Sequence, residues 1–165
     1  MKNTWVKAIG GTALALSLLL VGGAQMFGSG QNNERHQRSI EGAWRTTVTI
    51  RNCQTGAPIT TFQGLQTFNE GGTLAETAGG GPPSSRSPGH GVWNREHGRQ
   101  HYSFAFMFDR YNPDGTFAGS TTVRGDVTLD ASGDEMTVVS ANELFNPAGQ
   151  LIATGCSTAT ATRFE

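Results

Sequence analysis

The stretch 42-GAWRTTVTIRNC-53 decides the fold, because a residue near each of its ends has a matching partner in the last apolar run, 151-LIATGCSTATATRF-164. Facing residues in an antiparallel pair of strands have a constant sum of residue numbers. That sum is 207 for Trp44 with Arg163 and 209 for Cys53 with Cys156. Along each strand, the two residues lie on opposite faces. One antiparallel register with a small bulge therefore satisfies both contacts, with the indole and the guanidinium inside and a disulfide outside.

Between these two runs the chain shows one short strand after another and no helical periodicity. Turn sequences such as Asn112-Pro113-Asp114-Gly115 favour short reversals between neighbouring strands. The predicted strands are Ala43–Cys53, Ile59–Phe68, Thr73–Thr77, Gly91–Arg95, Gln100–Tyr111, Thr116–Leu129, Glu135–Phe145 and Leu151–Phe164. Because pairing of the first strand with the last leaves no exposed edge, we predict a closed, eight-stranded, antiparallel up-and-down β-barrel over residues 40–165. The one long connection, 78–89, is rich in Gly and Pro and suits a mouth loop or lid.

The motif Gly42-x-Trp44, together with Arg163 near the end of the last strand, resembles the lipocalin and wider calycin families. The resemblance covers these three residues. It implies that Arg163 lies over the Trp44 indole in a cation–π contact that closes one end of the barrel. The interior of such a barrel is either packed or holds one small ligand. The architecture is also similar, more weakly, to the allene-oxide-cyclase-like barrels, which implies a cyclase or isomerase.

The first residues have the pattern of a secretory signal: Lys2 and Lys7, then an apolar stretch, then small residues before a cut after Ala24. We predict a signal peptide over 1–24, followed by a polar, flexible linker over 25–39. The alternative is an uncleaved membrane anchor, which would be the only contact with a membrane.

Export predicts a secreted or periplasmic protein. In an oxidising compartment an even pair of cysteines usually forms a disulfide, so we expect a bond between Cys53 and Cys156. The alternative is a pair of unrelated buried thiols.

Charge argues against a nucleic-acid partner. The chain has 12 Lys and Arg against 13 Asp and Glu, and the predicted cut removes both lysines, which leaves a net charge of about −3. This is not the balance of a nucleic-acid-binding protein. Without lysine, Schiff-base chemistry has no nucleophile, and no sequence motif predicts a cofactor.

The most distinctive strand, 101–111, places Tyr102, Phe104, Phe106 and Phe108 on one face. Directed inward, they form an aromatic wall for an apolar or amphipathic ligand, whereas the more common explanation of such residues is an ordinary core. Gly119 and Gly125 of the neighbouring strand and the small residues of the last strand either pack against this wall or leave a cavity. The predicted ligand contacts are Trp44, Trp93, Tyr102, Phe104, Phe106, Phe108 and Arg124.

The candidates for general acid–base chemistry are His90, Tyr102, Asp126 and Glu143. His90 lies where the long loop enters a strand, and its alternative is a hydrogen-bonded loop histidine. Charges within strands, such as Asp126, are more commonly solvated cross-strand partners. The spacing of His90, His97 and His101 is poor for convergence on one ion, so no metal site is predicted.

These observations favour an exported barrel that binds a small apolar or amphipathic molecule. Two alternatives stay open: a small barrel cyclase or isomerase acting on an apolar substrate, and a structural domain whose barrel is filled. An interior void would exclude the filled barrel. A buried His, Asp or Glu with a shifted pKa in that void would favour the enzyme.

Overall fold

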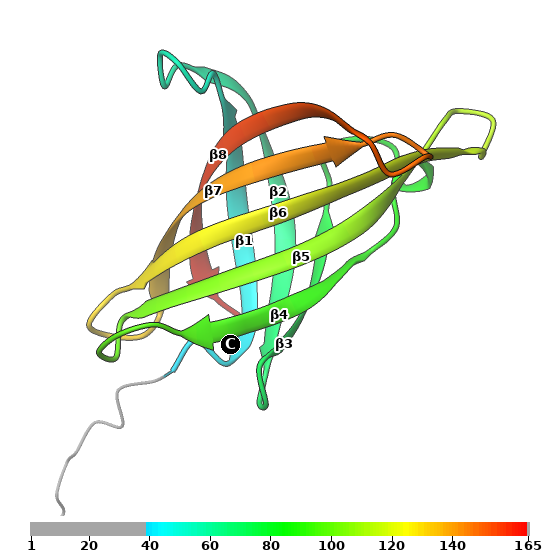
Figure 1. The fold of residues 1–165 in the computed structure, drawn as a ribbon. Helices are drawn as coiled ribbons and strands as arrows, with labels where there is room; N and C mark the ends of the chain where they lie inside the picture. The colour runs from blue at the N-terminus through cyan, green and yellow to red at the C-terminus, as the bar shows by residue number, and fades with distance from the viewer. Residues whose placement is uncertain (1–38, 165) are drawn as a thin grey trace, which may run out of the picture. The chain divides into compact units, whose positions relative to one another are not determined.

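A computed structural model of the chain describes residues 39–164, which form one barrel with its strands in sequence order (Figure 1). The elements are β1 (Gly42–Arg51), β2 (Pro58–Asn69), β3 (Thr73–Ala78), the 3-10 turn η1 (Pro83–Ser85), β4 (Gly89–Arg95), β5 (His101–Tyr111), β6 (Phe117–Leu129), β7 (Glu135–Phe145) and β8 (Leu151–Arg163). The predicted closed, eight-stranded antiparallel barrel is confirmed. The predicted signal peptide (1–24) and all but the last residue of the predicted linker (25–39) lie outside the described residues. Within residues 39–164, no helix is long and apolar enough to cross a membrane.

The predicted strand ends agree with the structure to within two residues. Cys53 is one of the differences, because β1 stops at Arg51. The side-chain oxygen of Asn52 accepts hydrogen bonds from the backbone N–H groups of Gln54 (2.9 Å) and Thr55 (3.0 Å) and so starts the turn into β2. Three predicted hairpin turns each place a glycine in the left-handed region: Gly115 (φ 84°), Gly133 (φ 78°) and Gly149 (φ 75°).

The seam between β1 and β8 follows the register expected from the sequence. Trp44 faces Arg163, and the pairing continues without a shift to Arg51 facing Cys156. The predicted bulge in this ladder is absent. Cys53 instead lies two residues beyond Arg51, in the turn, and from there it forms a disulfide with Cys156 across 5.3 Å between Cα atoms. The position of Cys53 in the turn therefore accounts for the difference between the residue-number sums of the two pairs, 207 for Trp44 with Arg163 and 209 for Cys53 with Cys156.

The Trp44–Arg163 pair closes one end of the barrel, which we call the base. The Trp44 indole is fully buried and donates a hydrogen bond to the Ile40 carbonyl at 2.8 Å. The Arg163 guanidinium lies 4.4 Å from the centre of the Trp44 ring and donates to the carbonyls of Ser39 (2.7 Å) and Gly133 (2.6 Å). Gly42, at φ 124°, makes room for it, because a Cβ there would lie 2.7 Å from Arg163 Nη1.

A packed core fills the barrel above this pair. It consists mainly of large side chains that alternate along the strands with exposed ones. The fully buried members are Trp44, Tyr102, Phe68, Ile40, Leu129, Met136 and Val127. At the opposite end, which we call the mouth, lie the β1–β2, β5–β6 and β7–β8 turns (Figure 1).

We expect Arg163→Met to lower the free energy of unfolding by about 3 kcal/mol, since it removes a cation–π contact and leaves several carbonyls without their donor. Urea unfolding followed by tryptophan fluorescence measures this change. The control is Arg45→Met, which removes an exposed arginine next to Trp44 and should change the free energy of unfolding by less than about 0.5 kcal/mol. Equal effects of both substitutions would contradict the role assigned to Arg163.

Candidate functional site

The half of the barrel toward the mouth holds a cavity of about 590 Å³. Its wall is made by inward side chains of every strand except β4. About half of the lining side chains are apolar: Val48, Ile50, Phe62, Phe104, Phe106, Phe108, Val123, Val138, Leu144 and Ala159. The barrel is therefore not filled along its whole length, as the structural-domain alternative would require. The base is packed, and the mouth half is hollow.

Two glycines in the barrel wall differ in what lies beside them. Gly125 on β6 receives the Phe104 ring, which would overlap any side chain added there. Gly155 on β8 differs, because a Cβ added at that position would meet nothing closer than Asn142 Nδ2, at 3.5 Å. The sequence left open whether small residues served packing or a cavity. Gly125 serves packing, and Gly155 leaves space.

A buried ion pair lies in the wall of this cavity. Glu76 on β3 is 7 % exposed, and its carboxylate accepts hydrogen bonds from the Arg86 guanidinium. Burial raises the pKa of Glu76, and the positive charge and hydrogen bonds of Arg86 act in the opposite direction. The guanidinium carbon of Arg86 also lies 3.6 Å from the centre of the Phe108 ring. The pair thus joins β3, the long loop and β5 around one side of the cavity.

The long loop between β3 and β4 holds Arg86 in place. Ser87 pairs with Asp109 of β5: its N–H donates to the Asp109 carbonyl at 2.9 Å, and its hydroxyl accepts from the Asp109 N–H at 3.0 Å. Gly80, in the first half of the loop, lies against Phe62 of β2. Gly80 and Arg86 both line the cavity. The loop predicted as a mouth loop or lid therefore forms part of the cavity wall.

A second polar group lies on β7 and β8. The hydroxyls of Ser140 and Ser157 are 2.7 Å apart, and Asn142 donates to the Ser157 hydroxyl at 3.3 Å. All three residues line the cavity. The wall therefore combines apolar side chains with a comparable number of polar ones. Small-molecule sites likewise use polar groups within an apolar lining to orient a ligand.

The predicted ligand contacts separate into three groups. Phe104, Phe106 and Phe108 line the cavity. Trp44, Trp93 and Tyr102 belong to the packed core near the base; the Trp93 indole donates to the Asn69 carbonyl (2.9 Å) and the Tyr102 hydroxyl to the Arg99 carbonyl (3.0 Å). Arg124 is on the outer surface, where its Nε lies 3.7 Å from a Glu143 carboxylate oxygen.

The structure does not bring the four acid–base candidates together. His90 and Asp126 are exposed, Glu143 pairs with Arg124 outside, and Tyr102 points into the core. His97 and His101 stack on each other at the β4–β5 hairpin, with ring centres 4.5 Å apart. No three His, Cys, Asp or Glu side chains converge on a metal position anywhere in residues 39–164.

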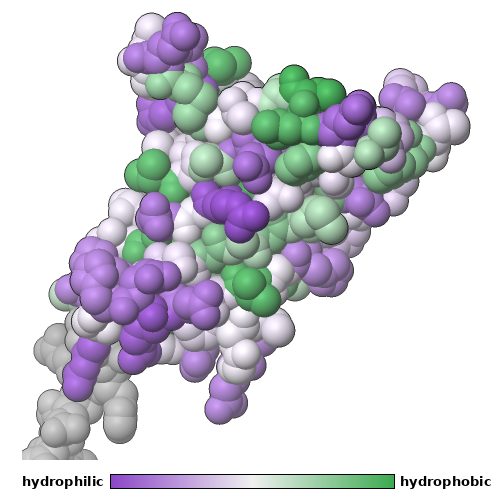
Figure 2. Space-filling view, viewed as in Figure 1, coloured by the Kyte–Doolittle hydropathy of each residue, from purple (hydrophilic) through white to green (hydrophobic). Residues whose placement is uncertain are grey.

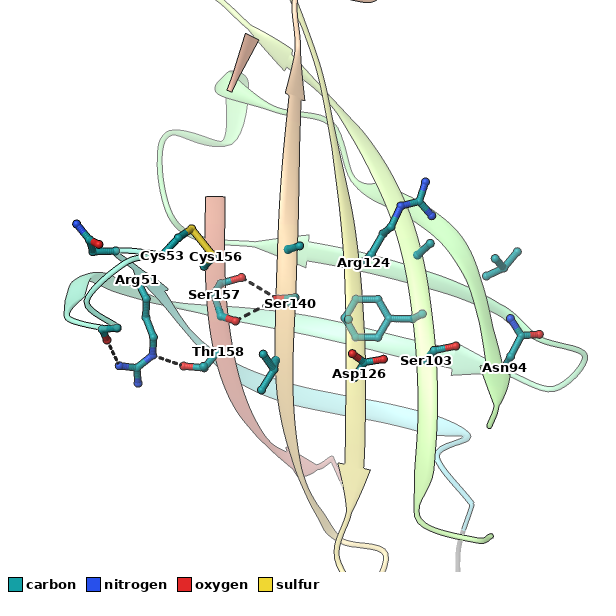
Figure 3. Close-up of a pocket in the computed structure, with 18 residues that line it drawn as sticks. Arg51, Cys53, Asn94, Ser103, Arg124, Asp126, Ser140, Cys156, Ser157 and Thr158 are labelled. Carbon is teal, nitrogen blue, oxygen red and sulfur yellow. Dashed lines mark hydrogen bonds between the residues drawn. A yellow bond between two sulfur atoms is a disulfide. The ribbon is translucent and has the colours of Figure 1, made fainter. Parts of the chain in front are cut away.

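A further hollow, of about 780 Å³, lies on the outer surface (Figure 3). Outward side chains of β4 to β8 form most of its lining, including Arg124 and Asp126, with the Cys53–Cys156 disulfide at one side. The Arg124 side chain is 65 % exposed and already has Glu143 as an ionic partner. Hydrophobic and hydrophilic side chains are interspersed over the face seen in Figure 2. The barrel interior is therefore the stronger candidate site.

Glu76 and Arg86 were not among the residues predicted from the sequence. Glu76 could have been found by alternation, since it shares a face with Leu74, which is buried. Arg86 could not have been found in this way, because it lies in a loop, where side chains do not alternate between two faces. Comparison of the chain with protein families, curated proteins and solved structures finds no match.

The raised pKa of Glu76 predicts how its contribution to stability depends on pH. The folded state favours the protonated carboxyl, so this contribution is fully present below the pKa in the unfolded chain and is lost as pH rises through the raised pKa. The free energy of unfolding of the wild type should therefore fall relative to Glu76→Gln as the pH rises above 4.5, the ordinary pKa of the group. Urea titrations of both proteins at a series of pH values measure the difference, and a rise over that range would contradict it.

Proposed function

We propose that this protein is an exported, lipocalin-like barrel that binds a small apolar or amphipathic molecule in its interior cavity. The observation that carries the proposal is the cavity of about 590 Å³ above a tightly packed base. Cavities that take small organic ligands typically measure about 300–1,000 Å³ and are mainly apolar. The aromatic residues Phe104, Phe106 and Phe108 supply a wall that suits an apolar body.

The likeness to lipocalins rests on the geometry at the base. Gly42 leaves room for Arg163, and Arg163 lies over Trp44, as the resemblance implies. Export is supported by the signal-like pattern at the start of the chain and by the disulfide between Cys53 and Cys156. The proposed location is therefore secreted or periplasmic.

Filling the cavity tests the binding proposal. Gly155→Leu places a side chain into the open space beside Asn142, so we expect it to weaken binding of the neutral fluorescent probe N-phenyl-1-naphthylamine by about tenfold or more. Fluorescence titration measures the affinity. The matched control is Thr154→Leu, the neighbouring and exposed position on β8, which should bind as the wild type does. Unchanged binding by Gly155→Leu, with the fold verified by circular dichroism, would exclude the interior as the site.

Glu76 favours a second candidate, a cyclase or isomerase acting on an apolar substrate. It is a buried carboxyl group with a raised pKa in the cavity wall, which suits a general acid or base. In this reading Arg86 positions the carboxyl group, and the aromatic wall holds the substrate in a reactive shape. Its ion pair with Arg86 is equally explained as a structural link to the loop, so binding remains the first proposal.

Compounds that co-purify from the native compartment separate these two functions. An enzyme that isomerises or cyclises its substrate conserves mass, so wild type and Glu76→Gln should hold compounds of equal mass that differ in chromatographic retention. A binding protein should hold one and the same compound in both forms. Native mass spectrometry, followed by chromatography of the released compound, makes the comparison.

A further inference from the structure

Two buried hydrogen-bond donors in the cavity wall have no partner among the described residues. They are Nε of Arg110 on β5 and the hydroxyl of Thr121 on β6. Thr121 is only 5 % exposed, and both residues line the cavity. Buried polar groups in folded proteins almost always have partners, so two such donors in one wall indicate a place for an acceptor from outside the chain.

The β-ladder places these two donors next to each other. Arg110 faces Gly119, and Thr121 faces Phe108, so the two donors are diagonal neighbours on adjacent strands at the mouth end. Nη2 of Arg110 donates to the Phe145 carbonyl at 2.7 Å, which holds the guanidinium at the β6–β7 edge of the mouth. Nε is then left free to donate to a ligand.

The charged side chains of the cavity wall indicate whether that ligand is an anion or a cation. The two arginines of the cavity wall are Arg86, which is paired with Glu76, and Arg110, which has no carboxylate within 4 Å among residues 39–164. The wall therefore carries one uncompensated positive charge. A partly buried cation without a counter-charge is costly, and an anionic ligand would remove that cost.

The aromatic face extends from this charge into the barrel. Phe108 and Phe106 follow Arg110 on the inward face of β5, their ring centres are 6.4 Å apart, and the ring planes are inclined by 30°. A ligand with its charged group at Arg110 would thus have its apolar body along this aromatic face, on the side of the Phe108 ring that the Arg86 guanidinium does not cover.

We propose that Arg110 and Thr121 form a subsite for the carboxylate of an amphipathic ligand, with Nε–H and the hydroxyl each donating to one oxygen. This inference rests on the proposed binding function and adds the chemical class of the ligand: an apolar chain or ring body ending in a single negative charge. It makes no use of the ion pair between Glu76 and Arg86.

The test compares decanoate with 1-decanol, which has the same chain length and no charge. Displacement of N-phenyl-1-naphthylamine should show that decanoate binds about tenfold or more tightly than 1-decanol. Arg110→Gln should weaken decanoate binding by about tenfold or more and leave 1-decanol binding unchanged. Thr121→Val keeps nearly the same side-chain shape and removes only the unpartnered hydroxyl, so it should also weaken decanoate binding. It provides the test if Arg110→Gln fails to fold. The control is Arg124→Gln, an arginine on the outer surface, which should bind both compounds as the wild type does.

Three results are decisive. A preference for decanoate that Arg110→Gln or Thr121→Val removes supports the subsite. Equal binding of the two compounds, or a preference that neither substitution changes, overturns the subsite while leaving the binding function in place. Failure of the wild type to bind the neutral probe at all overturns the binding function itself, and the subsite with it.

Discussion

The contact of the Arg163 guanidinium with the Trp44 indole is the interaction on which the rest of the barrel depends. It joins the first strand to the last, and the same guanidinium donates to carbonyl groups before β1 and in the β6–β7 turn. Three segments that are distant in sequence are thereby held at one end. The β1–β8 ladder continues from this contact to the disulfide, and the barrel that it closes has no free strand edge for pairing with other chains.

Closure at the base allows the other half of the barrel to remain hollow. Large side chains such as Phe68, Tyr102 and Met136 are fully buried in the base, and burial of such apolar surface stabilises the fold. The mouth half is then free to carry groups that a well-packed core would exclude, including Glu76, Arg86 and Arg110. The packed half of the barrel and the half that carries these polar groups are thus separated along the length of the same strands.

The sequence predicts which face of a strand a residue occupies better than it predicts the height of that residue in the barrel. Phe104 and Tyr102 share an inward face, yet Phe104 lines the cavity and Tyr102 lies in the core below it. Alternation has a period of two residues and carries no information on depth. The register of β1 with β8 could be predicted from the sequence, because the Trp44–Arg163 and Cys53–Cys156 pairs constrain it at both ends of the seam. The position of Arg86 could not be predicted, because this residue reaches the cavity from a loop whose path depends on the pairing of Ser87 with Asp109.

The long-range seam also has a consequence for folding kinetics. Cys53 and Cys156 are 103 residues apart in sequence, and every pair in the β1–β8 ladder is similarly distant, whereas most other strand pairs are joined by short hairpins. Closing so long a loop costs entropy before the contacts it permits can compensate, so we expect seam formation to be the slow step. Until then β1 and β8 are unprotected edges open to association with other chains. Once the disulfide has formed, the two strands stay tethered, and a barrel that opens transiently can close again without repeating the search.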